Sequence, residues 1–95
     1  MYYVYLLKSE DKNFFYIGST DDLKRRFVEH NLGENISTKH YAPFKLIYYE
    51  AYLSKKDALV RENKLKHHGA AIGHLKKRVK NSLVARIVSK ERGEA

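Results

Sequence analysis

Two polar side chains fall within the apolar stripe of a predicted helix, where a chemical role is one explanation for them. Residues 21–31 begin with two carboxylates after a pair of hydroxyl residues, which is typical of a helix N-terminus. At about 100° per residue, Arg26 and His30 lie among Leu23 and Phe27. Two interpretations stay open. Either both residues belong to a functional site, or Arg26 lies at the edge of the stripe and extends its charged end to solvent while His30 is buried and hydrogen-bonded.

A carboxylate occupies the same kind of position on a second predicted helix, formed by residues 54–67. Helical spacing places Glu62 beside Ala58 and close to Leu65. A buried carboxylate is costly unless it has a basic partner or binds a metal. Glu62 therefore either pairs with a group such as Arg26, or faces a cleft and holds a hard cation through oxygen.

Tyrosine is prominent in the first two β-prone runs, residues 2–8 and 14–18, which predict a hairpin. Because side chains alternate along a strand, Tyr16 and Gly18 share one face of the second run. Tyr5 can point to the same side if the pairing register permits. A strand tyrosine more often packs than reacts, so residue type alone does not select a catalyst.

The remaining elements complete an α+β pattern of strand, strand, helix, strand, helix, helix around a small antiparallel sheet. Gly33 ends the first helix, residues 33–43 form a loop with the single proline, and residues 44–53 form a third strand that can join either edge of the hairpin. Gly69 and Gly73 bracket a break before an amphipathic C-terminal helix. The apolar positions of that helix are Leu75, Val79, Leu83 and Ile87.

Composition narrows the classes of function. The chain has 95 residues, a net charge of +8 and no cysteine. One domain fits this length, and any metal must be held by oxygen or imidazole because thiolate ligands and thiol nucleophiles are excluded. The positive charge favours nucleic acid as the partner. No run has the roughly 20 apolar residues of a membrane span, and the N-terminus lacks a signal-peptide pattern, so we expect a cytoplasmic location with no membrane partner.

Short motifs follow one another along the chain in a defined order. They are Tyr3-Val4-Tyr5, Tyr16-Ile17-Gly18, Arg26, His30 and Glu62. This order resembles the GIY-YIG nuclease family. Further segments, among them Leu23-Lys24-Arg25-Arg26, Thr38-Lys39-His40 and residues 43–50, look like its short single-domain UPF0213-like branch. The resemblance covers residues 2 to about 82.

The resemblance implies a three-stranded antiparallel sheet flanked by helices, and phosphodiester hydrolysis with one divalent cation, Mg²⁺ or Mn²⁺. By position, it implies that Tyr5 is the general base or positions water with help from Tyr16. It further implies that Arg26 stabilises charge on the phosphate, that His30 assists and that Glu62 binds the metal. A phenol with a pKa near 10 is a poor base until a neighbouring cation favours its phenolate, and such a site supplies one.

Three details concern the fit to that family. The first motif is Tyr-Val-Tyr and not Gly-Ile-Tyr, which is tolerable where the strand needs no positive φ. Family members often carry another basic catalytic residue on the loop, and both Lys39 and His40 match its place. Asn81 is a candidate for the asparagine that some members have after the metal-binding glutamate.

Three functions compete: an endonuclease acting on DNA ahead of RNA, a non-cleaving nucleic-acid-binding module, and a protein-interaction adaptor. Cleavage should need Glu62 and a divalent ion, whereas binding through phosphates should weaken with salt and need neither. The candidate phosphate-binding residues are Lys24, Arg25, Lys39, Lys66, Lys76, Lys77 and Arg78. We expect a nuclease-like domain over residues 1–82 and a C-terminal helical extension with a frayed end over residues 83–95.

Overall fold

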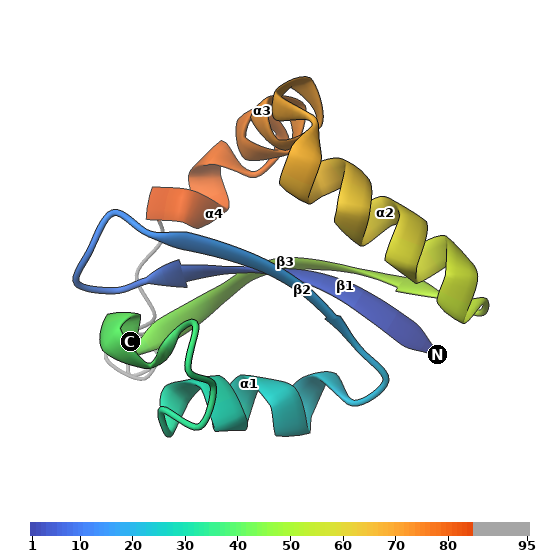
Figure 1. Cartoon of the computed structure of the whole chain (residues 1–95). Helices are drawn as coiled ribbons and strands as arrows, with labels where there is room; N and C mark the ends of the chain where they lie inside the picture. The colour runs from blue at the N-terminus through green and yellow to red at the C-terminus, as the bar shows by residue number, and fades with distance from the viewer. Residues whose placement is uncertain (85–95) are drawn as a thin grey trace, which may run out of the picture.

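The sheet has its first strand in the middle. The structure is a computed structural model that describes residues 1–84. Strand β1 (Tyr2–Ser9) pairs antiparallel with β2 (Phe15–Thr20) on one side and with β3 (Phe44–Tyr52) on the other, giving the order β2-β1-β3. The third strand thus joins the free edge of β1 and leaves β2 as an edge strand (Figure 1).

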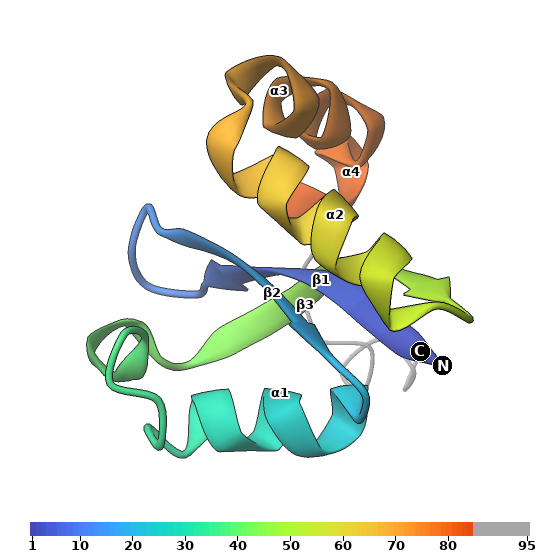
Figure 2. The same ribbon diagram turned by 45° about the vertical axis from the view of Figure 1, so that its right-hand side comes forward.

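The alternation of β1 divides the interior into two cores. Val4 and Leu6 pack with residues of the later helices, whereas Tyr5 and Leu7 pack on the opposite face with residues of the first helix. All four side chains are at most 2% exposed. Helix α1 accordingly lies on one face of the sheet, and α2, α3 and α4 lie on the other (Figures 1 and 2). The predicted α+β class with a three-stranded antiparallel sheet flanked by helices is confirmed.

Helix α1 (Leu23–Asn31) begins two residues later than expected and is capped differently. The Asp22 carboxylate accepts a hydrogen bond from the backbone N–H of Arg25 at 3.1 Å. The hydroxyl pair before it does not cap the helix: Ser19 donates its hydrogen bond to Glu62, and Thr20 accepts from the N–H of Asp22, the cap residue itself. At the other end, Gly33 has φ of +75° and its N–H bonds to the carbonyl of His30, so it ends the helix as predicted.

The helices on the second face differ in part from the prediction. Helix α2 (Lys55–His67) starts at its predicted cap, Ser54, whose hydroxyl accepts from the N–H of Asp57. The predicted break at residues 69–73 is wrong, because α3 (Gly69–Arg78) includes them. The chain instead breaks at His68, and again at Val79 before α4 (Lys80–Val84). Leu75 and Val79 are buried, as the apolar repeat predicted. The repeat, however, runs across two helices, α3 and α4, and not along one.

The loop between α1 and β3 contains a short 3-10 helix, η1 (Lys39–Tyr41). Asn31, at the end of α1, ties this region to the sheet by accepting a hydrogen bond from the N–H of Phe44 at 2.6 Å. No helix within residues 1–84 combines the length and the apolar character needed to cross a membrane. Ile87 and the expected frayed end lie outside the described residues, and the domain boundary at residue 82 stays a prediction.

Candidate active site

Gly18 lets a buried phenol lie against the edge strand. In the β1–β2 register Tyr5 faces Gly18, so both residues are on the α1 side of the sheet. A Cβ atom at Gly18 would lie 2.6 Å from Cζ of Tyr5 and 2.9 Å from Cε2 of Tyr16, and it would also collide with the Tyr5 hydroxyl. The missing side chain therefore makes room for the Tyr5 hydroxyl, and the Tyr5 and Tyr16 rings lie 6.2 Å apart.

A line of buried hydrogen bonds leads away from that phenol. The Tyr5 hydroxyl lies 2.9 Å from Nε2 of His30, and Nδ1 of His30 lies 2.9 Å from Oγ1 of Thr38. His30 and Thr38 are fully buried and Tyr5 is 2% exposed. His30 is thus a buried, hydrogen-bonded histidine, as one of the two interpretations of the sequence expected. It is at the same time a direct partner of the candidate catalytic phenol.

Burial sets the protonation of this pair. Burial, and then the charge of the neighbouring Tyr16, raises the pKa of Tyr5 to about 12. Burial, reinforced by the positive charge of Arg26, lowers the pKa of His30 to about 4. Near neutral pH, a protonated phenol therefore faces a neutral imidazole.

Arg26 adds a cation to the same face. Its guanidinium is hydrogen-bonded to Tyr5, and its Nη1 forms an ion pair with Oε1 of Glu29 at 2.9 Å. The Arg26 side chain remains 28% exposed, so it borders solvent while it touches the buried phenol. A bound phosphate can reach it from outside, because arginine carries several N–H donors in a fixed fork.

Glu62 approaches the edge strand from the other face of the sheet. Oε1 of Glu62 accepts a hydrogen bond from the Ser19 hydroxyl at 2.7 Å, and Oε2 pairs with Nζ of Lys66 at 2.9 Å. Its basic partner is thus Lys66 and not Arg26. The preceding residue, Arg61, pairs with Glu50 of β3 at 2.9 Å. Because consecutive helix residues point about 100° apart, that ion pair helps to fix the rotation of α2 that turns Glu62 toward β2.

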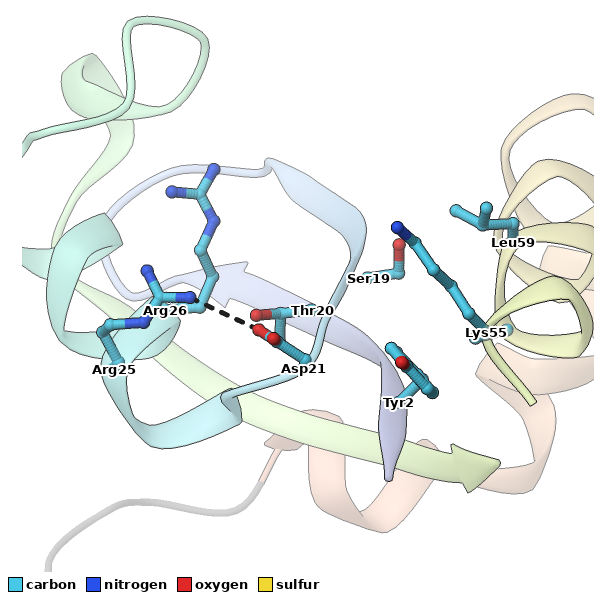
Figure 3. Close-up of a pocket in the computed structure, with 9 residues that line it drawn as sticks. Tyr2, Ser19, Thr20, Asp21, Arg25, Arg26, Lys55 and Leu59 are labelled. Carbon is cyan, nitrogen blue, oxygen red and sulfur yellow. Dashed lines mark ion pairs between the residues drawn. The ribbon is translucent and has the colours of Figure 1, made fainter. Parts of the chain in front are cut away.

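The two halves of the site meet around β2. Nζ of Lys66, which belongs to α2, lies 5.7 Å from the ring centre of Tyr16 on the α1 side. The charge of Glu62 likewise acts on the Tyr5 phenol. Figure 3 shows Ser19 and Thr20 of β2 between Arg26 on one side and Lys55 on the other. A phenol, a guanidinium and a carboxylate therefore gather at one sheet edge.

The donor set around Glu62 suits a hard cation that keeps most of its water. Within residues 1–84 there is no group of three or more histidine, aspartate or glutamate side chains arranged to hold a metal. Mg²⁺ in proteins is commonly bound by only one or two carboxylates and retains several waters, so a single glutamate fits it. In the structure Lys66 supplies a positive charge at that carboxylate.

The structure separates the predicted basic residues into two groups. Lys66 and Lys76 follow β2, since Lys76 lies 4.0 Å above the ring centre of Phe15 at the start of that strand. Lys24 and Arg78 lie toward β3, where Arg78 is hydrogen-bonded to Tyr48. Arg25 is exposed and pairs with carboxylates near it in the chain, those of Asp21, Asp22 and Glu29. The other predicted side chains that the structure leaves exposed are Lys39, His40, Lys77 and Asn81.

Four residues with a part in this arrangement were not predicted as site residues. Gly18 makes room for Tyr5, Thr38 orients His30, Ser19 holds Glu62, and Lys55 borders the hollow beside Ser19. The loop therefore contributes Thr38 to the buried hydrogen bonds, whereas the neighbouring Lys39 and His40 are exposed. Gly18 has a signal in the sequence, because it shares a strand face with Tyr16, but the hydroxyl residues Ser19 and Thr38 carry none that is comparable.

Fold and site together define a small α+β domain with a polar site built across an edge strand. The chain belongs to the GIY-YIG family, whose catalytic-domain description matches residues 1–80. This is a nuclease superfamily. The UPF0213 protein of Lacticaseibacillus paracasei is 42% identical over 67 residues, covering 70% of this chain and 74% of that one.

A second relative and a solved structure agree with this assignment. The UPF0213 protein HQ_3675A of Haloquadratum walsbyi is 35% identical over 68 residues, covering 70% of this chain and 75% of its own. The solution structure of a UPF0213 protein from Bacillus halodurans is similar with a TM-score of 0.52 and 30% identity, over 83% of this chain and 87% of that one. The predicted UPF0213-like branch is confirmed.

Proposed function

We propose that this chain is a metal-dependent endonuclease that hydrolyses phosphodiester bonds in nucleic acid, with DNA as the substrate ahead of RNA. The observation that carries the proposal is the meeting of three groups at the edge of β2: the Tyr5 hydroxyl, the Arg26 guanidinium and the Glu62 carboxylate. Membership of the GIY-YIG family supports the same chemistry. The net charge of +8 suits a polyanionic substrate.

Arg26 has the task of holding the phosphate that is cut. Its hydrogen bond to Tyr5 and its ion pair with Glu29 fix the guanidinium, and its exposed part faces solvent. Negative charge grows on the phosphate oxygens during hydrolysis, and a preorganised guanidinium stabilises that charge without having to move. Arg26 is therefore a catalytic residue in the proposal.

Tyr5 has the task of orienting the attacking water. With Nδ1–H of His30 donated to Thr38, the free Nε2 accepts the Tyr5 proton, and the phenol oxygen remains available to a water. Tyr5 Oη can then take a proton from water as its own proton passes to His30. Tyr16 lies beside Tyr5, with the two ring centres 6.2 Å apart, and burial keeps Tyr5 protonated until substrate is bound. This gives His30 a direct use in the reaction.

Glu62 is the residue that would hold a divalent cation, Mg²⁺ or Mn²⁺. When bound, that ion supplies positive charge to the phosphate oxygens and lowers the pKa of a bound water. Ser19 fixes the carboxylate by hydrogen-bonding Oε1, and Lys66 lies at Oε2. A bound ion would therefore compete with the lysine ammonium for this carboxylate.

A second function, a non-cleaving nucleic-acid-binding module, has one observation in its favour. Lys66 already neutralises Glu62, and Lys66 and Lys76 continue along β2 as a basic track. Such a protein would bind phosphates through these lysines and keep the Glu62–Lys66 pair intact. Its binding would weaken steeply with salt and would not depend on Glu62.

Cleavage assays separate the two functions. Labelled single-stranded, duplex and branched DNA and RNA are incubated with Mg²⁺ or Mn²⁺, and Glu62→Gln is compared with Glu34→Gln, which alters an exposed glutamate. The proposal predicts cutting that needs the divalent ion, is lost in Glu62→Gln and persists in Glu34→Gln. Salt-sensitive binding without cutting on every substrate, equal in both variants, would establish the binding module.

A further inference from the structure

A hollow of about 450 Å³ lies beside the candidate active site, between the first turns of α1 and α2. Ser19 and Thr20 of β2 separate it from Glu62 and the buried phenol. In Figure 3, the Lys55 side chain extends from α2 toward Ser19, and the Tyr2 ring lies below it. A volume of this size accommodates one small organic group such as a nucleotide.

Besides Arg26, which the proposed function assigns to the cleaved phosphate, one cation of this hollow is available to an anionic ligand. Arg25 is held by carboxylates, at 3.6 Å from Asp21 and 2.8 Å from Glu29, and Arg26 also pairs with Glu29. Among the ion pairs of residues 1–84, Lys55 has no carboxylate partner, although it is the first residue of α2, where the helix dipole is positive. A phosphate entering the hollow therefore finds its free positive charge at Lys55.

The part of the lining around Lys55 is apolar (Figure 3). The Tyr2 ring is half-buried, Ala58 forms part of the floor, and Leu59 is 46% exposed beside charged neighbours. An exposed leucine next to an aromatic ring and a lysine resembles the surroundings that proteins offer to an unstacked base with its phosphate. The hollow thus combines a lysine with two apolar side chains, Leu59 and Tyr2, that flank it in Figure 3 and are called its apolar wall below.

The hollow continues the line of groups on α2. Lys55, Leu59, Glu62 and Lys66 are spaced so that they share one face of the helix, and Glu62 and Lys66 reach the β2 edge. At about 1.5 Å of rise per residue, Lys55 lies about 10 Å along the helix from Glu62. A phosphate on Lys55 is therefore a neighbour of the phosphate at the candidate active site and not the same one.

We infer that this hollow binds the nucleotide next to the cleaved phosphodiester, with its base unstacked against Tyr2 and Leu59 and its phosphate on Lys55. The inference rests on the proposed function, because it takes the β2 edge as the cutting site. It assigns a substrate class, namely nucleic acid with an unpaired nucleotide beside the cut, such as a single strand or an overhang. A continuous blunt duplex keeps its bases stacked and cannot fill the apolar wall.

Binding measured in EDTA tests the inference without any cleavage. Fluorescence anisotropy gives the affinity of labelled DNA and RNA oligonucleotides, single-stranded or blunt duplex, with an abasic nucleotide moved along the strand. Lys55→Ala is compared with Lys56→Ala, the exposed neighbour on the same helix. Leu59→Asn and Tyr2→Leu alter the apolar wall, and the exposed Leu59 gives a variant with little risk to folding.

We expect tighter binding of the single strand, and Lys55→Ala to weaken it about 3- to 10-fold more than Lys56→Ala at equal salt. One abasic position should weaken wild-type binding about tenfold but have little effect in Leu59→Asn or Tyr2→Leu. Equal loss in both lysine variants, or an abasic effect that is the same in all proteins, would overturn the inference. If the expected binding differences appear but no metal-dependent cutting is found, the nucleotide site stands and the nuclease is rejected. If cutting is found without these binding differences, the nuclease stands and the nucleotide site is rejected.

Discussion

Gly18→Ala should abolish the geometry of the site while leaving the fold largely in place. The added Cβ would lie 2.6 Å from Cζ of Tyr5 and 2.9 Å from Cε2 of Tyr16. Carbon atoms in contact are about 3.5 Å apart, so the Tyr5 ring must move by about 1 Å. A misplacement of about 1 Å at a catalytic group costs on the order of 100-fold in rate. Overpacking of this kind destabilises a protein by about 1–3 kcal/mol.

The assay compares cleavage rate and stability in the same variants. Gly73→Ala is the matched control, because a Cβ there meets no atom within 4 Å and alanine favours the interior of a helix. We expect Gly73→Ala to cut at the wild-type rate and to resist urea as well as wild type or slightly better. Gly18→Ala should lose about 100-fold in single-turnover rate under conditions where urea unfolding shows it to be folded.

Two results would refute this reasoning. Gly18→Ala with wild-type activity would mean that the position of the Tyr5 phenol does not matter to the reaction. A loss of activity explained by unfolding alone would mean that Gly18 serves packing only. The second case is recognised when adding a stabilising osmolyte restores both folding and cutting.

Three further predictions concern charges around the site. The pKa of His30 falls from 6.5 in the unfolded chain to about 4 in the folded protein, so the unfolded chain binds more protons between these pH values. The free energy of unfolding should therefore decrease by up to about 3 kcal/mol as the pH falls through that range. Urea titrations of His30→Asn should show a weaker decrease. Lys66→Met should tighten Mn²⁺ binding to Glu62 about tenfold by calorimetry, because a competing unit charge is removed. Arg26→Lys should lower the cleavage rate about 100-fold with little change in DNA affinity, because an ammonium lacks the guanidinium fork.

Each of these has a defined contrary outcome. The same pH dependence in His30→Asn would assign the titration to other groups. Unchanged or weaker Mn²⁺ binding in Lys66→Met, with Lys64→Met as the control on the same helix, would mean that the lysine does not compete with the ion. A full cleavage rate in Arg26→Lys would mean that one point charge is sufficient at the phosphate.

The periodic pattern of apolar residues in the sequence predicts much of the fold and part of the candidate site. Alternation along the strands allowed Tyr5 and Tyr16 to share one side of the sheet, and the observed register puts them there. Helical spacing correctly indicated that Arg26 and His30 face the interior in part. Glu62 was expected to need a partner, and it has two. These conclusions follow from local geometry, which the order of residues largely determines.

Non-local contacts could not be obtained in the same way. The helix break at His68 replaces the one expected between Gly69 and Gly73, because glycine is tolerated inside a helix when its neighbours, such as Leu75, pack on the core. Thr38 and Ser19 act through partners that lie 8 and 43 positions away. Such hydrogen bonds depend on the tertiary fold, so they cannot be predicted from the residue type alone.

The central claim is that the Tyr5 phenol takes part in phosphodiester hydrolysis, and one comparison tests it most directly. Tyr5→Phe removes the hydroxyl that bonds His30, and Tyr49→Phe removes a hydroxyl from a tyrosine that is 51% exposed on β3. Single-turnover cleavage of the best substrate is measured with Mg²⁺ or Mn²⁺ in both variants. We predict that Tyr5→Phe binds the substrate normally and cuts at least about 100-fold more slowly, whereas Tyr49→Phe cuts at the wild-type rate. Equal cleavage by both variants would contradict the assignment of Tyr5.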